Sequence, residues 1–377
     1  MITQQIKFND LSKQWEDIEE SCMESLLDML RSGWYIGGPY LDKFEKSFAD
    51  YTGRKHAIGV SNGTDGLKLA IQSMNLEGKT NVIMAANTYI ADIIAIDHQV
   101  RGDFEVTLLD HDDYFLLDLD HLENHLDQNR DKYDNVVIMA VHLYGQPINM
   151  IKLERISNKY NCRVLEDASQ SHGAMYSDEI VGTRSEMCVY SLYPGKSLGA
   201  IGDAGIVTTD NEEHANSLRA LRNYGSSVKY HYDDIGWNNR MDPLQAIFLD
   251  EKLRLLDGWN EKKNKIADMY TEHLGTCVET PKVADHVDRH VYHIYAILCE
   301  DRENLQKFLN DRGIPTVIHY PIPIHMTKPY RHMTCNDCEK TMHNADRLLS
   351  LPMHPYLSED DVKFVCDSIL EFYNETD

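Results

Sequence analysis

Short apolar segments of strand length alternate with helix-like segments through residues 56–209, and this alternation constrains the fold more than any other feature. Residues 135–141 are almost entirely apolar, as a parallel strand buried on both faces should be. Helical stretches such as 150–159 supply the crossovers that a parallel sheet needs. The sequence therefore predicts an α/β fold with a mostly parallel sheet. The expected strands are residues 56–60, 81–85, 104–110, 135–141, 163–167, 186–190 and 206–209.

The rest of the chain is long enough for a second, smaller domain, since 377 residues exceed what one α/β unit needs. One long helix is expected at residues 244–264, where it links the two parts. Strands at 291–299 and 315–320 and a helix at 302–312 are expected beyond it. We therefore expect a large domain with N-terminal helices over residues 1–255 and a small α+β domain over residues 256–377.

The charge balance excludes some classes of partner. Lys+Arg 37 and Asp+Glu 61 give a formal net charge of −24, whereas nucleic acids and anionic membranes bind basic surfaces. No segment reaches about 18 consecutive apolar residues, and the first ten residues lack an apolar signal core. We expect a cytoplasmic protein with reduced thiols that binds neither nucleic acid nor membrane. Cys335 and Cys338 form a single CxxC pair without a second pair at zinc-like spacing, so no metal site is assigned.

Lys196 lies in a glycine-rich loop between the expected strands 186–190 and 206–209. Pro194 and four glycines between positions 195 and 205 exclude a regular helix or strand, so the backbone there can approach a ligand closely. A lysine held in this way can have a lowered pKa and can condense with an aldehyde. Taken alone, a surface lysine in a turn is the plainer alternative.

Asp167 gives Lys196 a chemical partner. It ends the expected strand 163–167, and ligands of α/β sheets collect at the carboxyl ends of strands. Pyridoxal phosphate requires a lysine for its aldehyde and a carboxylate for its protonated ring nitrogen. An acid and a lysine on neighbouring strand ends therefore point to this cofactor.

Residues 61–64 (Ser-Asn-Gly-Thr) join the first expected strand to a helix at 67–74. The free N–H groups and positive end of a helix favour an anion there. The segment lacks the lysine of a Walker loop, and a simple helix cap is the alternative. Together with Lys196, it leads us to assign Gly63 and Thr64 to the cofactor phosphate, with Asp65 as a weaker candidate.

These segments resemble the DegT/StrS family of pyridoxal-phosphate-dependent nucleotide-sugar aminotransferases, of fold type I. The similarity runs from about residue 34 to about residue 365. It implies a three-layer α/β/α fold with a mostly parallel sheet, a smaller C-terminal domain and a homodimer with shared active sites. The family-like segments, in order, are residues 61–67, 86–91, 141–147, 163–173, 191–205, 236–242, 318–325 and 351–355.

The resemblance also implies roles toward the cofactor. Tyr89 matches the aromatic residue that stacks on the pyridine face, and Gln170 matches one beside the phenolic oxygen. Ser191 matches a phosphate ligand. Asn238 matches the residue that reaches the phosphate in the neighbouring subunit. His172 is either a further cofactor contact or a histidine that satisfies backbone groups.

Three residues match positions that face the sugar in similar enzymes: Tyr193, His319 and Tyr320. Prolines at positions 321 and 323 make the segment after His319 an extended loop. Thr327 stands where the family often has glutamine, which leaves the fine substrate preference open.

The resemblance implies that Lys196 holds pyridoxal 5'-phosphate and acts as the base that moves a proton during transamination. The expected amino donor is L-glutamate and the expected acceptor is a dTDP- or UDP-linked keto-6-deoxyhexose, with a 3-keto sugar favoured. Amination at C4 of the 4-keto sugar and a non-catalytic regulator on this fold are the alternatives. A dehydratase is disfavoured because family dehydratases replace the lysine by histidine, and a Rossmann oxidoreductase lacks its glycine motif.

Overall fold

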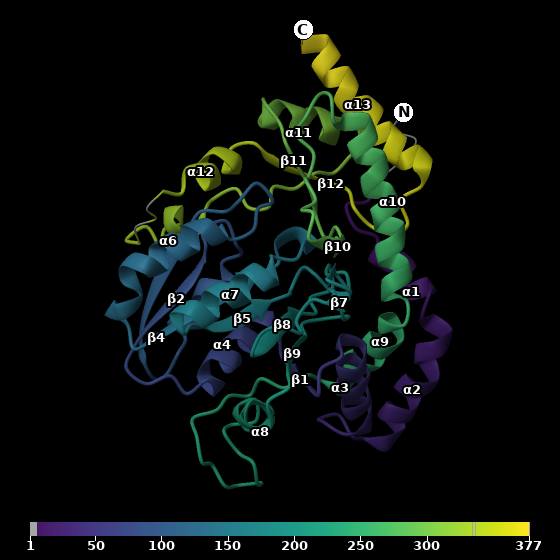
Figure 1. Cartoon of the computed structure of the whole chain (residues 1–377). Coiled ribbons are helices and arrows are strands. Elements are labelled where there is room, and N and C mark those ends of the chain that lie inside the picture. Colours follow the sequence, from purple (N-terminus) through teal and green to yellow (C-terminus); the bar gives the residue numbers. More distant parts are fainter. Residues whose placement is uncertain (1–5, 334, 336, 377) are drawn as a thin grey trace.

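The fold is centred on a seven-stranded sheet, seen in a computed structural model that describes residues 6–333, 335 and 337–376 (Figure 1). The strand order is β1-β9-β8-β5-β4-β2-β3. β9 runs opposite to the other strands and pairs antiparallel with β1 and β8, whereas the remaining pairs are parallel, so the predicted mostly parallel sheet is confirmed. The strands are β1 (His56–Val60), β2 (Lys79–Ala85), β3 (Asp103–Leu109), β4 (Asn135–Val141), β5 (Arg163–Asp167), β8 (Met187–Ser191) and β9 (Gly205–Thr209).

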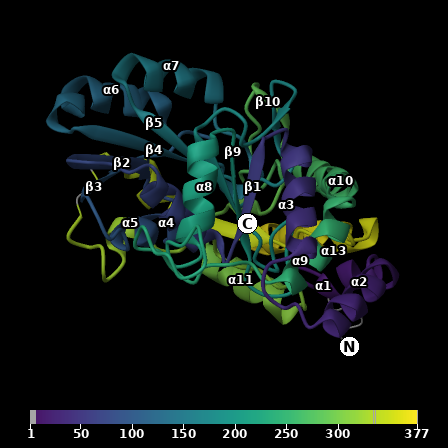
Figure 2. The ribbon, with the colours of Figure 1, turned by 90° about the horizontal axis from the view of Figure 1, so that it is seen from below.

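Helices cover both faces of this sheet, because its central strands are apolar on both sides. Figure 2 shows α6 (Leu119–Asn129) and α7 (Met150–Tyr160) on one side of β2, β4 and β5, with α4 (Gly63–Ser73) and α5 (Ala91–Asp97) on the other. The further helices of this part are α1 (Leu11–Glu16), α2 (Glu19–Ser32), α3 (Pro39–Thr52), α8 (Glu212–Leu221) and α9 (Pro243–Leu253). The predicted three-layer α/β/α architecture is confirmed.

A second apolar core lies in the C-terminal part, where α10 (Leu256–Leu274) and α13 (Glu359–Thr376) pack around a two-stranded sheet. The segment 324–345 instead returns to the large sheet, since Ile324 and Tyr330 belong to its core. The separate core supports the division at residues 255 and 256, which stays a prediction. The remaining elements are β6 (Met175–Tyr176), β7 (Glu179–Ile180), β10 (Val287–Arg289), β11 (Tyr295–Leu298), β12 (Leu348–Leu351), α11 (Arg302–Asp311) and α12 (Glu339–Ala345).

Two expected elements are wrong. The single helix over 244–264 is two helices, α9 and α10, separated at Arg254 and Leu255. Neither proline nor glycine marks this break, so apolar spacing alone could not reveal it. The strand over 315–320 is absent: Val317 makes one isolated bridge to Ser350, after which the chain turns back toward the large sheet. The strand over 291–299 shortens to β11.

The cysteine pair also differs from expectation, because Cys335 and Cys338 are joined in a disulfide with Cα atoms 5.8 Å apart. The two cysteines lie next to each other just before α12. The expectation of reduced thiols is therefore wrong for this pair. Among the residues that the structure describes, no helix is both long and apolar enough to cross a membrane.

Candidate functional site

The candidate residues meet in one cavity of about 860 Å³ between the large sheet and the C-terminal part. Asp167 and Ser191 end β5 and β8, and Thr88 follows β2, so parallel strands deliver them to one edge of the sheet. Every candidate from the sequence except His172 and Asn238 lines this cavity. These are Gly63, Thr64, Asp65, Tyr89, Asp167, Gln170, Ser191, Tyr193, Lys196, His319 and Tyr320.

One end of the cavity is suited to an anion. Gly63 is the first residue of α4, and a Cβ atom built on it would lie 2.8 Å from the Cβ atom of Ser191, so only glycine fits. This contact brings Gly63, Thr64 and Ser191 together at the positive end of the helix. The carboxylate of Asp65 already accepts hydrogen bonds from Lys68 at 2.7 Å and from Asn62 at 2.9 Å.

Lys196 projects from a loop whose path requires close backbone packing. A Cβ atom on Gly199 would lie 2.2 Å from the carbonyl oxygen of Pro194, so a side chain there would force the loop open. Two buried lysines hold the loop in place: Lys252 Nζ donates to Gly199 O at 2.8 Å, and Lys263 Nζ donates to Ser197 Oγ at 2.8 Å. The loop therefore presents its lysine at a defined position.

The amine of Lys196 is tuned for chemistry near neutral pH. Desolvation by the protein around it lowers its pKa to about 8, although Asp167 and Asp92 act in the opposite direction. Asp167 itself accepts a hydrogen bond from Ser169 N at 2.9 Å, which holds its carboxylate at the end of β5. A lysine that loses its proton readily thus stands near an acid.

Asp92 belongs to this site and was missed by the sequence reasoning. It lies in the first turn of α5, is fully buried, and accepts a hydrogen bond from Thr88 Oγ1. Its carboxyl group lies within hydrogen-bonding reach of the carboxyl group of Asp167. The feature of the sequence that could have revealed Asp92 is a single acid within the otherwise apolar helical stretch 90–96.

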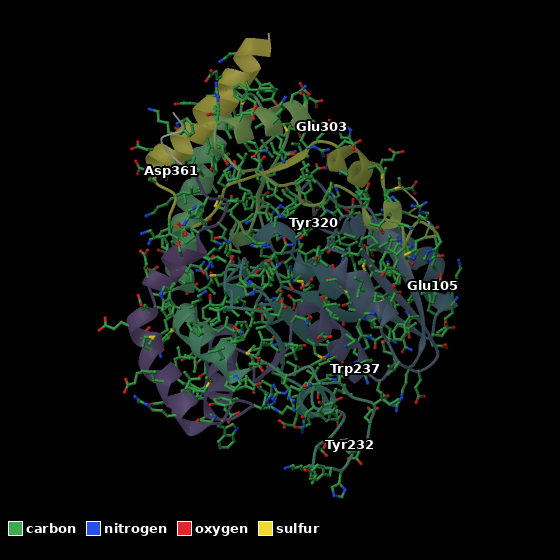
Figure 3. The ribbon with its side chains drawn as sticks, turned by 180° about the vertical axis from the view of Figure 1, so that it is seen from behind. Glu105, Tyr232, Trp237, Glu303, Tyr320 and Asp361 are labelled. Atoms are coloured by element: carbon green, nitrogen blue, oxygen red, sulfur yellow. A yellow bond between two sulfur atoms is a disulfide. The ribbon has the colours of Figure 1, made fainter. Side chains whose placement is uncertain are left out.

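The opposite wall is formed by His319 and Tyr320, and Figure 3 shows Tyr320 between the large sheet and the C-terminal part. Gln170 links the walls: its Nε2 donates to Tyr320 Oη at 3.1 Å, and its Oε1 accepts from Tyr144 N at 2.8 Å. Tyr144 Oη donates to His319 O. The rings of Tyr89 and Tyr320 lie 5.2 Å apart between centroids, so an aromatic surface continues across the cavity.

Two candidates lie elsewhere. His172 is buried against Tyr190, with ring centroids 5.6 Å apart, and does not line the cavity. Burial, followed by the nearby Lys196, lowers its pKa to about 3, so the ring is neutral. Asn238 is exposed and lies outside the cavity of its own chain.

Parallel strand ends that present a lysine and an acid beside a helix N-terminus are typical of pyridoxal-phosphate enzymes. The chain belongs to the DegT/DnrJ/EryC1/StrS aminotransferase family, whose model matches residues 16–370. It is a pyridoxal-phosphate-dependent aminotransferase.

The similarity to known proteins extends over nearly the whole chain. The chain is 38% identical to dTDP-3-amino-3,6-dideoxy-alpha-D-galactopyranose transaminase of Aneurinibacillus thermoaerophilus, over 97% of this chain and 98% of that protein. It is 34% identical to dTDP-3-amino-3,4,6-trideoxy-alpha-D-glucose transaminase of Streptomyces venezuelae, over 100% and 98%. The crystal structure of S. venezuelae DesV in complex with a ketimine intermediate superposes with a TM-score of 0.91 and 33% identity, covering 98% of this chain and 99% of that one.

The residues present fit the cofactor. Gly63, Thr64 and Ser191 line the cavity together at the N-terminus of α4, where free N–H groups favour a phosphate. The amine of Lys196 has a pKa lowered to about 8, and Asp167, in the same cavity, is an acid of the kind that the ring nitrogen of the cofactor requires. When bound, pyridoxal phosphate supplies an aldehyde for amines and a ring that accepts electrons.

Proposed function

We propose that this enzyme moves an amino group from L-glutamate to C3 of a dTDP- or UDP-linked 3-keto-6-deoxyhexose. The cavity carries the proposal, because its volume of about 860 Å³ extends from Lys196 to a polar wall at His319 and Tyr320. That volume is in the range of pockets that enclose ligands much larger than one amino acid. The names of the two relatives above, both of which act on 3-amino sugars, support the position of amination.

Each residue has a defined task in this proposal. Lys196 binds the cofactor and, once released by the amino donor, removes and returns the proton at the substrate carbon. Asp167 keeps a negative charge at the ring nitrogen, so that nitrogen stays protonated. The phosphate is held by Gly63, Thr64 and Ser191. The remaining proposed contacts are Tyr89 on the ring face, Gln170 beside the ring oxygen, and Tyr193, His319 and Tyr320 on the sugar.

We propose further that the working unit is a cytoplasmic homodimer in which Asn238 reaches the cofactor phosphate of the neighbouring subunit. The exposed position of Asn238, outside its own cavity, supports this arrangement. It follows a loop that projects below α8 in Figure 1, and Figure 3 shows Tyr232 on the same loop. Tyr232 is 61% exposed and Tyr230 is 75% exposed, which favours coverage by another chain.

The test is an amination assay with glutamate and four acceptors: the 3-keto and 4-keto 6-deoxyhexoses, each linked to dTDP and to UDP. The proposal predicts that one or both 3-keto compounds yield an amino sugar and stoichiometric 2-oxoglutarate. If product formed only from the 4-keto compounds, the C3 assignment would be overturned. Conversion of none, without a half-reaction with glutamate, would favour a non-catalytic regulator.

A further inference from the structure

The buried pair Asp92 and Asp167 is a feature that the proposed reaction does not yet use. Asp167 faces the cavity, whereas Asp92 lies behind it on α5 with no exposed surface. Asp92 Oδ2 accepts a hydrogen bond from the hydroxyl of Thr88. Asp92 Oδ1 is buried, and no hydrogen-bond donor in the described part of the chain contacts it. The carboxyl group that carries this atom lies within hydrogen-bonding reach of the carboxyl group of Asp167.

Two carboxyl groups that touch in a buried site cannot both be ionised without a large cost, so such a pair shares one proton. The positions of the two groups decide where the proton resides. Asp167 has a backbone N–H donor from Ser169 and faces the cavity, whereas Asp92 has only the Thr88 hydroxyl and no access to solvent. Burial, and then the charge of Asp167, raise the pKa of Asp92 well above its usual value. The proton therefore belongs on Asp92 and the charge on Asp167.

We propose that Asp92 is a positioning residue that remains a neutral carboxylic acid and donates a hydrogen bond to Asp167. The bond fixes one oxygen of Asp167 and leaves the other to face the ring nitrogen of the cofactor. A neutral donor also stabilises the anionic form of Asp167, so the acid keeps its charge beside the ring. The proposal rests on the cofactor chemistry of the family and does not depend on which sugar is the acceptor.

Two substitutions distinguish the contributions of the proton, the shape and the charge of the Asp92 side chain. Asp92→Asn keeps the shape, has an oxygen for the Thr88 hydroxyl and an N–H donor for Asp167, and carries no charge. Asp92→Ala removes the donor and leaves the Asp167 carboxylate with one hydrogen bond fewer. If Asp92 instead acted as an ionised group, both variants would be equally damaging.

The first experiment measures binding of pyridoxamine phosphate to the apoprotein by calorimetry, which requires neither turnover nor the Lys196 amine. Loss of a hydrogen bond to a charged group predicts binding weakened roughly tenfold or more in Asp92→Ala, and a change of less than about threefold in Asp92→Asn. Asp112→Asn is the matched control. Asp112 is a half-buried acid outside the cavity, with a pKa raised by burial to about 6, and its replacement should leave binding unchanged. Equal weakening in both Asp92 variants would overturn the proposal.

The second experiment detects the proton directly by infrared spectroscopy of the apoprotein at pH 7.5. The proposal predicts a carbonyl band of a protonated carboxylic acid in wild type that Asp92→Asn lacks and Asp112→Asn retains. If wild type has no such band, Asp92 is ionised and the proposal is wrong, even if Asp92→Ala fails to fold. Failure of every sugar acceptor, with these two results intact, would overturn only the proposed substrate.

Discussion

The two walls of the cavity are built in different ways. On the large-sheet side, Asp167 and Ser191 end two adjacent strands, and the register of the sheet fixes how far apart they lie. On the C-terminal side, His319 and Tyr320 belong to a connection without a strand. Individual hydrogen bonds hold it, such as the one between His319 Nδ1 and Ser350 Oγ at 2.9 Å. A rigid wall suits the chemistry of the cofactor, whereas a connecting segment can change without disturbing the sheet. We infer that the first wall performs the reaction and the second selects the substrate.

Lys196→Ala tests the reaction wall most severely. Removal of the amine eliminates both the attachment point and the base, so turnover should fall by roughly a thousandfold or more. Steady-state rates with glutamate measure the loss. Calorimetry with pyridoxamine phosphate is the control, because that ligand needs no lysine and should still bind. A variant with more than about a tenth of wild-type turnover would contradict the assignment.

Asp167→Asn should be the next largest change. Without the carboxylate the ring nitrogen loses its proton, and the ring accepts electrons poorly, so we expect turnover to fall by roughly a hundredfold or more. The absorption spectrum of the bound cofactor as a function of pH checks the cause, since the ring should titrate at a lower pH in the variant. If both the spectrum and the turnover were unchanged, the ring nitrogen would not contact Asp167.

Tyr320→Phe tests the selecting wall. The variant loses the Tyr320 hydroxyl, which lies 3.1 Å from Gln170 Nε2 and is proposed to contact the sugar. Loss of one neutral hydrogen bond to the sugar predicts a rise in its KM of up to about tenfold. The half-reaction with glutamate should keep its rate, as measured by stopped-flow absorption. If the half-reaction slows as much as the complete reaction, the two walls do not divide their tasks.

The smallest effect is one of pH. Only a neutral amine attacks an aldehyde, and burial lowers the pKa of Lys196 to about 8, so its neutral fraction increases as the pH rises through 8. The rate of cofactor attachment to apoprotein should increase roughly fivefold from pH 7 to pH 8 and level off above about pH 9. An ordinary lysine would give a rate that is still climbing at pH 10.

The same contrast explains what could be predicted from the sequence. The strands of the large sheet were predictable because both of their faces are apolar, and Asp167 and Lys196 follow from strand ends and a glycine loop. Val317 lies in a sequence that resembles a strand, yet only tertiary contacts decide that it makes a single bridge. Asp92 was missed because its importance comes from a neighbour distant in the sequence, Asp167, and the proposed role of Asn238 requires a second chain.

Comparison of two lysines leads to the most direct test. Lys196 and Lys263 both have a pKa lowered by burial, to about 8 and about 7, but only Lys196 lines the cavity with Asp167. Borohydride reduction of the enzyme loaded with pyridoxal phosphate fixes the cofactor to the amine that carries it, and peptide mass mapping identifies that residue. The account predicts stoichiometric label on Lys196 and none on Lys263. Label on Lys263, or no label, would contradict it.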